Sequence, residues 1–303
     1  MSEVVAWLAH GAGREALGTV SGADGRTTLA ALPPEVTVVD EPREDVEFAV
    51  PAWGVPFDAA ALPALKVVQV RSAGVDWIVD GVPEHITLCS ARGTRDAAMA
   101  EWIVAALLAD AKRLGPFARA RDWSRSDIFD LAGRRIVVLG HGSSGRAAER
   151  LLAPFGCEVV GVARRARDGV HAVEDLDALL PTADALVNLL PLTPATRGLV
   201  DAAVLARLPD GALYINLGRG PTTDTGALVA ELQRERLRAV LDVVDPEPLP
   251  GDHPLWTAPG VLISPHVAGD TPGGDQAAWR LVGEQLARYV AGEPLVNVVT
   301  DGY

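Results

Sequence analysis

The sequence is poor in cysteine, has fewer basic than acidic residues and contains no long apolar run. Its two cysteines, Cys89 and Cys157, match neither a CxxC pair nor a metal-ligand spacing, so we expect no disulfide framework and a reducing, cytoplasmic location. Asp and Glu number 40 against 27 Lys and Arg, and the formal net charge of −13 disfavours a nucleic-acid partner. Because no basic segment leads into a long apolar stretch, we expect neither a signal peptide nor a membrane span.

What is present is enough apolar material for packed cores. Hydrophobic residues make up 49% and charged residues 22% of the chain, which excludes wholesale disorder. The length of 303 residues favours two domains. The first 95 residues contain short β-rich runs bounded by proline, glycine and charges, and a helical pattern follows over about 96–114. The runs are Val4–Leu8, Val36–Val39, Val46–Val50, Val67–Val70 and Ile86–Cys89.

Continuous apolar strands alternate with helices from about residue 135 to residue 264. This alternation is typical of a parallel sheet with helices on both faces. A final amphipathic helix, about 275–291, leads into a strand-like run at 294–299 that has no place in the central sheet. We expect this helix and run to return to the N-terminal part of the chain. The helix at 100–109 is apolar enough to suit either a core or a subunit interface.

A glycine-rich turn, GHGSSG at 140–145, follows an apolar strand and opens a helix. In this context glycines let the backbone turn tightly and approach a pyrophosphate, which the amides of the helix N-terminus bind. The alternative is a tight turn without a ligand. The pattern therefore predicts a dinucleotide site. Its residues are Gly140, Gly142, Ser143, Ser144 and Gly145.

The strand after this turn bears on the choice of cofactor. NAD-binding domains carry an acidic residue about 20 positions after the turn, where it binds the ribose hydroxyls. Here Ala163 occupies that region and is followed by Arg164 and Arg165. Two guanidinium groups suit a 2′-phosphate, so we predict NADP(H) as the preferred cofactor and NAD(H) as possible. The alternative is a solvated basic patch.

Three ionisable side chains follow successive strands of the alternating region. They are Arg219 in INLGRGP, Glu247 in LDVVDPEPLP and His266 in SPHVAG. Ligands of open parallel sheets bind at the carboxyl ends of the strands. An arginine suits a carboxylate and a ketone, a histidine suits proton donation, and a glutamate orients and stabilises the protonated histidine. Each residue alone has a structural alternative, but their coincidence favours a catalytic set for 2-oxo acid reduction.

These motifs together resemble the D-isomer-specific 2-hydroxyacid dehydrogenase family, which includes glyoxylate/hydroxypyruvate reductases and phosphoglycerate dehydrogenases. The resemblance is strongest over about 133–270 and rests on LGHGSSG, NLLPLTPATRGLV, YINLGRGP, LDVVDPEPLPGDHPLW and LISPHVAG. It implies that Arg219 binds and polarises the substrate, that His266 exchanges the proton and that Glu247 is its partner. It also implies further cofactor contacts. These residues are Leu190, Pro191, Thr196, Leu217, Gly218, Asp242 and Gly269.

The resemblance also implies a substrate site in the N-terminal part. The family holds the substrate carboxylate on backbone amides of a loop that matches Ala73, Gly74 and Val75, and a glycine there permits close approach of an anion. Trp53 falls where the family selects among substrate side chains, although a tryptophan is more often a packing residue. The chain departs from the family pattern at Ser144, where a branched apolar residue is usual, and at Ala163. Formate dehydrogenases of this superfamily have a glutamine in place of Glu247, so the resemblance does not imply formate oxidation.

We therefore expect an α/β fold of two Rossmann-like domains with doubly wound parallel sheets. A cofactor domain, 97–271, would be inserted into a discontinuous substrate domain, 1–96 with 272–303. The predicted function is an NADP(H)-linked reductase of a small 2-oxo acid, most like a glyoxylate/hydroxypyruvate reductase, acting as a homodimer. The alternatives are an NAD-linked D-2-hydroxyacid dehydrogenase of the phosphoglycerate kind, or a dinucleotide-sensing interaction protein like the corepressors that share this fold.

Overall fold

A computed structural model describes residues 3–9 and 32–300 of the chain. By its internal contacts the chain divides into two units, Met1–Arg95 with Thr271–Tyr303 and Asp96–Asp270. The sequence placed these boundaries one residue later at each crossing. Each unit holds one sheet, and every pairing between the named strands is parallel. The expected α/β fold class is confirmed.

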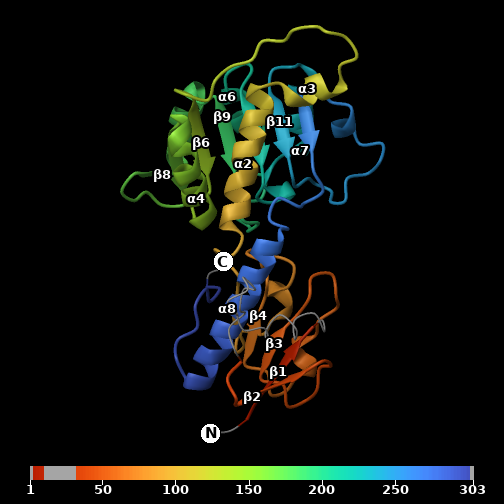
Figure 1. The fold of residues 1–303 in the computed structure, drawn as a ribbon, viewed down its shortest axis with the longest axis vertical. Helices are drawn as coiled ribbons and strands as arrows, with labels where there is room; N and C mark the ends of the chain where they lie inside the picture. The colour runs from red at the N-terminus through yellow and green to blue at the C-terminus, as the bar shows by residue number, and fades with distance from the viewer. Residues whose placement is uncertain (1–2, 10–31, 301–303) are drawn as a thin grey trace, which may run out of the picture. The chain divides into compact units, whose positions relative to one another are not determined.

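The first unit contains a five-stranded sheet in the order β2-β1-β3-β4-β5 (Figure 1). Its order reverses between β1 and β3, as in a doubly wound fold. The predicted strands are confirmed to within two residues at each end. The elements are β1 (Val4–Leu8), β2 (Val36–Val39), β3 (Phe48–Val50), β4 (Val67–Gln69), β5 (Thr87–Cys89) and α8 (Pro272–Ala291).

Alternate residues of β1 face opposite sides of this sheet. Val5 and Trp7 pack in one core cluster, whereas Ala6 and Leu8 pack on the other face with Trp279 of α8. A strand buried on both faces reads as a continuous apolar run, as β1 does. Helix α8 thus packs on the sheet of the first unit. The predicted strand-like run at 294–299 forms no named strand. It bends at 296–297, where Asn297 has a φ of 53°, and one isolated bridge joins Val298 to Cys89.

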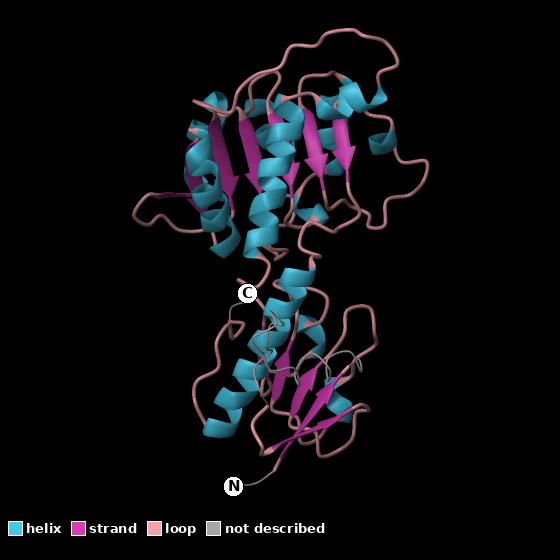
Figure 2. Cartoon of the chain, in the orientation of Figure 1, coloured by secondary structure: helices cyan, strands magenta, loops and turns pink. Residues whose placement is uncertain are grey.

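The second unit contains a seven-stranded sheet in the order β12-β11-β10-β9-β6-β7-β8, with helices on both faces (Figure 2). The strands are β6 (Arg135–Leu139), β7 (Glu158–Ala163), β8 (Val170–Ala172), β9 (Ala185–Asn188), β10 (Leu213–Asn216), β11 (Arg238–Leu241) and β12 (Val261–Ile263). The helices are α2 (Asp96–Ala111), α3 (Leu114–Arg119), α4 (Ser143–Leu152), α5 (Leu176–Leu179), α6 (Ala202–Arg207) and α7 (Thr225–Gln233). The order reverses between β6 and β9, which is where ligands bind in doubly wound sheets.

Each face of this sheet has its own core. Leu205 of α6 and Leu228 of α7 pack on one face, and Ile103 of α2 with Leu152 of α4 packs on the other. Helix α2, which contains the apolar segment 100–109, is therefore a core helix.

Candidate active site

Two buried asparagines end neighbouring strands and shape the turns that follow. Asn188 closes β9, and its Oδ1 accepts a hydrogen bond of 3.0 Å from the Leu190 amide. Asn216 closes β10, and its Oδ1 accepts a bond of the same length from the Gly218 amide. Side-chain bonds of this kind compete with the sheet and end a strand. The signal for this arrangement is the repeated Asn-Leu after an apolar strand, whose meaning the sequence reasoning missed.

A buried hydroxyl network joins these two turns. Asn188 Nδ2 donates to the Tyr214 hydroxyl and to Thr222 Oγ1, both at 2.9 Å. Thr222 Oγ1 in turn donates to the Arg219 carbonyl at 2.6 Å, and Asn216 Nδ2 reaches the same carbonyl at 3.3 Å. Burial raises the pKa of Tyr214 to about 12, although its hydrogen bonds with Thr223 and Asn188 act in the opposite direction. The hydrogen-bonded side chains of Thr222 and Asn216 therefore hold the backbone of Arg219 in place.

Glycines on both sides of Arg219 permit close approach of neighbouring backbone. A Cβ atom at Gly218 would lie 2.5 Å from the carbonyl oxygen of Leu190. One at Gly220 would lie only 1.8 Å from the carbonyl oxygen of Val244. The Arg219 side chain, whose Nη1 donates to the Gly218 carbonyl at 2.9 Å, thus leaves a turn that only glycines can flank.

Asp242 organises the turn that carries His266. Its Oδ1 accepts from Ser264 Oγ at 2.6 Å and from the Val267 amide at 2.9 Å, and its Oδ2 accepts from the Ala268 amide at 2.9 Å. Its carbonyl accepts from the His266 amide at 2.8 Å. Asp242 is buried, so this carboxylate is saturated with bonds from one turn. That positioning role was missed by the sequence reasoning, which assigned Asp242 only to the cofactor.

His266 and Glu247 form a direct pair. The imidazole Nδ1 lies 2.6 Å from Glu247 Oε1, and the two side chains are 35% and 39% exposed. His266 has a φ of 54°, a left-handed conformation that is uncommon without glycine. The pair follows strands β11 and β12, and Arg219 follows the adjacent strand β10. The three predicted residues thus come from the carboxyl ends of three neighbouring strands.

The glycine-rich turn joins β6 to α4. Gly140 has a φ of +100°, and a Cβ atom there would lie 2.8 Å from the carbonyl carbon of Leu189. At Gly142 a Cβ would meet nothing within 4 Å, so the N-terminus of α4 opens to a free space. A Cβ atom at Gly145 would lie 3.1 Å from the Gly140 carbonyl oxygen. This cradle fits a pyrophosphate on the amides of the ten-residue helix α4.

The two serines of this turn bind an acidic side chain. Ser143 Oγ and Ser144 Oγ both donate to Asp96 Oδ1, at 3.1 and 2.8 Å. Asp96 begins α2, so the serine at 144 ties two helix N-termini together where an apolar side chain would not. Their hydroxyls stabilise the turn, and their backbone amides remain the groups predicted to meet the pyrophosphate.

Basic residues follow β7, as the sequence indicated. Arg164 and Arg165 are exposed directly after Ala163, the last residue of the strand. A third arginine, Arg167, donates to the His141 carbonyl of the glycine-rich turn. The His141 ring is only 5% exposed and covers Gly161 of β7, where a Cβ would lie 2.6 Å from its Cγ. Arg167 and His141 were missed because nothing in their spacing indicates this contact.

The remaining predicted cofactor residues lie on the loops after β9, β10 and β12. Leu190 and Pro191 follow β9, and Thr196 Oγ1 donates to the Pro191 carbonyl at 2.6 Å. Leu217 and Gly218 directly follow β10. Gly269 lies three residues after His266. All belong to the second unit, at the same strand ends as the glycine-rich turn.

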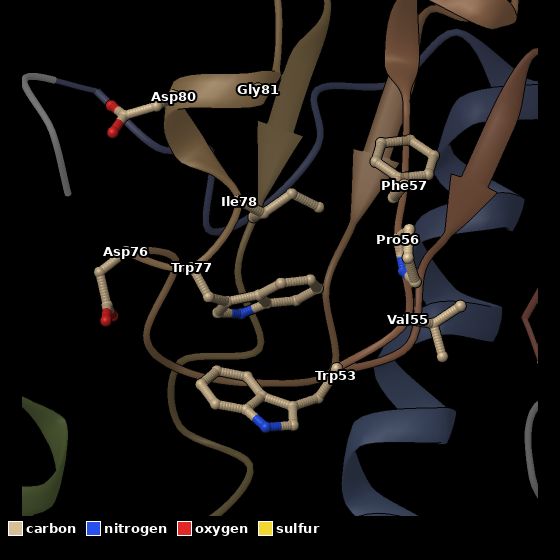
Figure 3. A pocket seen from close by; sticks show the side chains of 10 residues that line it. Trp53, Val55, Pro56, Phe57, Asp76, Trp77, Ile78, Asp80 and Gly81 are labelled. Carbon is tan, nitrogen blue, oxygen red and sulfur yellow. The ribbon is translucent and has the colours of Figure 1, made fainter. Parts of the chain in front are cut away.

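The predicted substrate loop lies in the first unit, after β4. Ser72 Oγ donates to the Gly74 carbonyl at 2.7 Å, and the Ala91 amide donates to the Ser72 carbonyl at 2.8 Å. Ala73 is exposed, whereas Gly74 and Val75 are buried. Trp53 lies in the loop after β3 and is 60% exposed (Figure 3). Both hydrogen bonds involve Ser72 and fix the start of the loop.

The second unit matches a known family model. Residues 102–268, more than half of the chain, match the model of the D-isomer specific 2-hydroxyacid dehydrogenase, NAD binding domain. The chain belongs to the D-isomer specific 2-hydroxyacid dehydrogenase family. As a member of this family it is an oxidoreductase acting on a CH–OH group, which confirms the predicted enzyme class.

Characterised relatives have two different activities. The chain is 35% identical over 227 residues to glyoxylate/hydroxypyruvate reductase B of Salmonella newport, covering 69% of this chain and 70% of that protein. It is 31% identical over 250 residues to D-3-phosphoglycerate dehydrogenase of Methanocaldococcus jannaschii, covering 78% of this chain but 47% of that protein. The chain therefore spans about half the length of this phosphoglycerate dehydrogenase.

Solved structures match the whole chain. A D-isomer specific 2-hydroxyacid dehydrogenase from Xanthobacter autotrophicus Py2, in complex with NADPH and MES, is 33% identical with a TM-score of 0.83. An NADPH-dependent glyoxylate/hydroxypyruvate reductase from Sinorhizobium meliloti, in complex with NADP and sulfate, is 30% identical with a TM-score of 0.81. Both alignments cover 100% of each chain. Across residues 3–9 and 32–300, no helix has the length and apolarity that crossing a membrane requires.

Proposed function

We propose that this chain is an NADP(H)-dependent reductase of a small 2-oxo acid, of the glyoxylate/hydroxypyruvate reductase kind. The observation that carries the proposal is the 2.6 Å pair of His266 and Glu247 on strand ends next to that of Arg219. An intact acid–base pair favours catalysis over the dinucleotide-sensing alternative, which needs no proton donor.

The chain's own residues fit the cofactor. The cradle of Gly140, Gly142 and Gly145 at the N-terminus of α4 would hold the pyrophosphate, and Arg164 and Arg165 would bind a 2′-phosphate. Leu190, Pro191, Thr196, Leu217, Gly218, Asp242 and Gly269 would line the remainder. Bound there, NADPH supplies a hydride, with its electron pair, to the carbonyl carbon of the substrate.

The polar residues supply the proton and the orientation. As the carbonyl π bond of the substrate breaks, the carbonyl oxygen takes a proton from Nε2 of His266. His266 later regains a proton from solvent. Glu247 holds Nδ1 and so turns Nε2 away from itself. The forked donors of Arg219 bind the carboxylate and polarise the ketone. In sum, a 2-oxo acid, NADPH and a proton give a 2-hydroxy acid and NADP⁺.

The preference for NADP rests on two kinds of support. Ala163 ends β7 without a carboxylate, and the exposed Arg164 and Arg165 follow it. The relatives from X. autotrophicus and S. meliloti were solved with NADPH and NADP. Because a 2′-phosphate is repelled by an acid and attracted by arginine, this strand end suits NADP better than NAD.

The test is turnover with a matched histidine control. Purified protein should oxidise NADPH when glyoxylate or hydroxypyruvate is added. His266→Ala should lower kcat by about 100-fold or more, since general acid catalysis contributes roughly 10²- to 10⁴-fold, and a thermal-shift assay should show that it still binds NADPH. The control His85→Ala changes an exposed histidine of the first unit and keeps the rate. Wild-type turnover in His266→Ala contradicts the mechanism.

The proposed enzyme is a homodimer joined through the second unit. Apolar side chains are exposed along α3 and the loop after it, including Phe117 at 41%, Trp123 at 100% and Ile128 at 57%. Figure 1 shows this loop extending past the end of the sheet. A fully exposed tryptophan in such a stretch favours a protein contact. Light scattering should give two copies, and Trp123→Ser should favour the monomer, whereas Leu151→Ser on the exposed side of α4 should not.

A cytoplasmic location is part of the same proposal. Cys89 and Cys157 are both free thiols, as is usual in a reducing compartment. Cell fractionation with an antibody to the native chain tests it, and recovery outside the cytoplasmic fraction contradicts it.

A further inference from the structure

The carboxylate of Asp96 lies beside the glycine-rich turn that the proposed function assigns to the pyrophosphate. Helices α2 and α4 lie side by side on one face of the second sheet (Figure 1), and Asp96 is the first residue of α2. Its Oδ1 accepts hydrogen bonds from Ser143 Oγ at 3.1 Å and from Ser144 Oγ at 2.8 Å. Both serines belong to the first turn of α4. A negative group is thus held at the helix end that would receive an anion.

The backbone amides at this end of α4 remain open to a ligand. Gly142 precedes the helix and has no side chain that could cap it. The Arg146 amide donates to the Gly142 carbonyl at 3.1 Å, and the amides of residues 143–145 come before that bond, so they have no acceptor within the helix. Asp96 binds the two serine hydroxyls and leaves these amides to the pyrophosphate.

The charge of Asp96 is not balanced by a cation. Of the residues that the structure describes, only the two serines donate hydrogen bonds to its carboxylate, and hydroxyl groups carry no charge. An uncompensated carboxylate next to an anion site disfavours the anion.

The carboxylate is close enough to a bound phosphate for this repulsion to act. A phosphate on the Ser144 amide and the carboxylate on the Ser144 hydroxyl are separated by two hydrogen bonds of about 3 Å and by one serine residue. That separation is shorter than the Debye length, which is about 10 Å at 0.1 M salt. The two like charges are therefore only partly screened from each other.

We propose that the charge of Asp96 weakens dinucleotide binding at the α4 N-terminus and thereby speeds the release of the oxidised cofactor. The inference rests on the proposed NADP(H)-dependent function, in which the cofactor must leave after each hydride transfer before another can bind. Release steps of this kind limit kcat in many enzymes. Since the pyrophosphate is common to NADP(H) and NAD(H), Asp96 acts on both cofactors, whereas Arg164 and Arg165 act on the 2′-phosphate alone.

Asp96→Asn tests the proposal, because it removes the charge and keeps an oxygen that both serines can reach. At low salt the Kd for NADPH, from a fluorescence titration, and the rate of NADPH dissociation, from stopped flow, should each fall about tenfold. The Kd for NADH should fall by the same factor. Raising the salt to about 0.5 M should shrink the difference from wild type, because salt screens the repulsion.

A matched variant and two cofactor fragments locate the effect. Asp130→Asn makes the same charge change next to Lys112, at the opposite end of α2, and should leave the Kd for NADPH unchanged. ADP-ribose carries the pyrophosphate and should bind Asp96→Asn about tenfold more tightly than wild type. The fragment 2′-AMP lacks the pyrophosphate and should bind both proteins equally.

Asp96→Ala distinguishes repulsion from a purely structural role of the two hydrogen bonds. Alanine removes the charge and the acceptor together, so repulsion predicts tighter NADPH binding, as in Asp96→Asn, whereas a structural role predicts weaker binding. If the wild-type protein binds NADPH and neither Asp96 variant binds it more tightly, the inference is wrong and the proposed function stands. If the wild-type protein binds neither NADPH nor NADH, the proposed function itself fails.

Discussion

Glu247 Oε1 lies 2.6 Å from Nδ1 of His266, and this contact joins the loops that follow two adjacent strands. The imidazole is also fixed through its backbone, because its amide donates to the Asp242 carbonyl at 2.8 Å. The Glu247 contact thus fixes the ring, and the bond to Asp242 fixes the backbone that carries it. A histidine that gives a proton in one direction needs such a constraint, since its two nitrogens are otherwise interchangeable.

Replacing Glu247 by glutamine should lower kcat by about 10- to 100-fold, in line with the loss of an orienting partner. KM for the 2-oxo acid should change little, because Glu247 does not bind the substrate in the proposed mechanism. Stability should change by less than about 1 kcal/mol, since the pair is more than a third exposed. Steady-state kinetics and urea unfolding measure these effects. Glu101→Gln, an exposed change on α2, is the control, and an undiminished kcat in Glu247→Gln would remove its orienting role.

Removing both arginines after β7 should weaken NADPH binding selectively. The double variant Arg164→Ala/Arg165→Ala should raise KM for NADPH about tenfold or more, because charge-assisted bonds to a 2′-phosphate are lost. KM for NADH should stay within about twofold. Arg150→Ala, an exposed arginine at the end of α4, is the matched control. Equal changes in KM for NADPH and for NADH would show that Arg164 and Arg165 do not bind the 2′-phosphate.

Local patterns explain which parts of the site the sequence could predict. The turn from Gly140 to Gly145 was recognisable because a strand precedes it and a helix follows it. Arg219, Glu247 and His266 were recognisable because each follows an apolar strand, and parallel strands end at one edge. Glu247 and His266 do meet in the structure, although the sequence could give no distance.

Contacts between distant segments could not be predicted in this way. Ser144 binds Asp96, 48 residues earlier in the chain, and Trp53 meets Trp77 across two loops. Periodicity describes one element at a time, and surface loops carry no register that would fix their partners. For the same reason the sequence predicted a strand-like run at 294–299, whereas the structure has a bend at 296–297 and a single bridge to β5.

Asp242→Asn tests the carboxylate that shapes the His266 turn. An asparagine offers one acceptor oxygen and an NH₂ group that faces backbone amides, so at least one buried donor loses its partner. We expect a loss of about 1–3 kcal/mol in the free energy of unfolding, together with a fall in kcat. Asp270→Asn, a nearby acid that accepts none of the three bonds from the 264–268 turn, gives the comparison. A fully stable, fully active Asp242→Asn would contradict this positioning role.

Glu47→Gln should make stability less dependent on pH. Hydrogen bonds from Lys66 and then from Tyr289 hold the pKa of Glu47 below its usual value of 4.5. A carboxyl with a lowered folded-state pKa stabilises the fold above its unfolded-state pKa, and this contribution is lost as pH falls through the folded-state value. The variant should therefore be less stable than wild type by about 1 kcal/mol at neutral pH, because Lys66 is largely exposed. Urea unfolding at several pH values should show the gap closing below pH 4.5, and a gap that widens in acid would contradict the assignment.

Comparing Gly220→Ala with Gly226→Ala distinguishes the effect of close backbone packing from the effect of helix propensity. A Cβ at Gly220 would lie 1.8 Å from the Val244 carbonyl oxygen, so the backbone of one segment must move. The change should displace the turn that carries Arg219, lowering kcat/KM about 100-fold or more and the free energy of unfolding by about 1–3 kcal/mol. At Gly226, in the first turn of α7, the nearest atom to a Cβ is Asp224 Oδ1 at 3.4 Å. Alanine there should keep activity and add up to about 1 kcal/mol of stability. If both variants behave alike in urea unfolding and in turnover, close packing at Gly220 does not position Arg219.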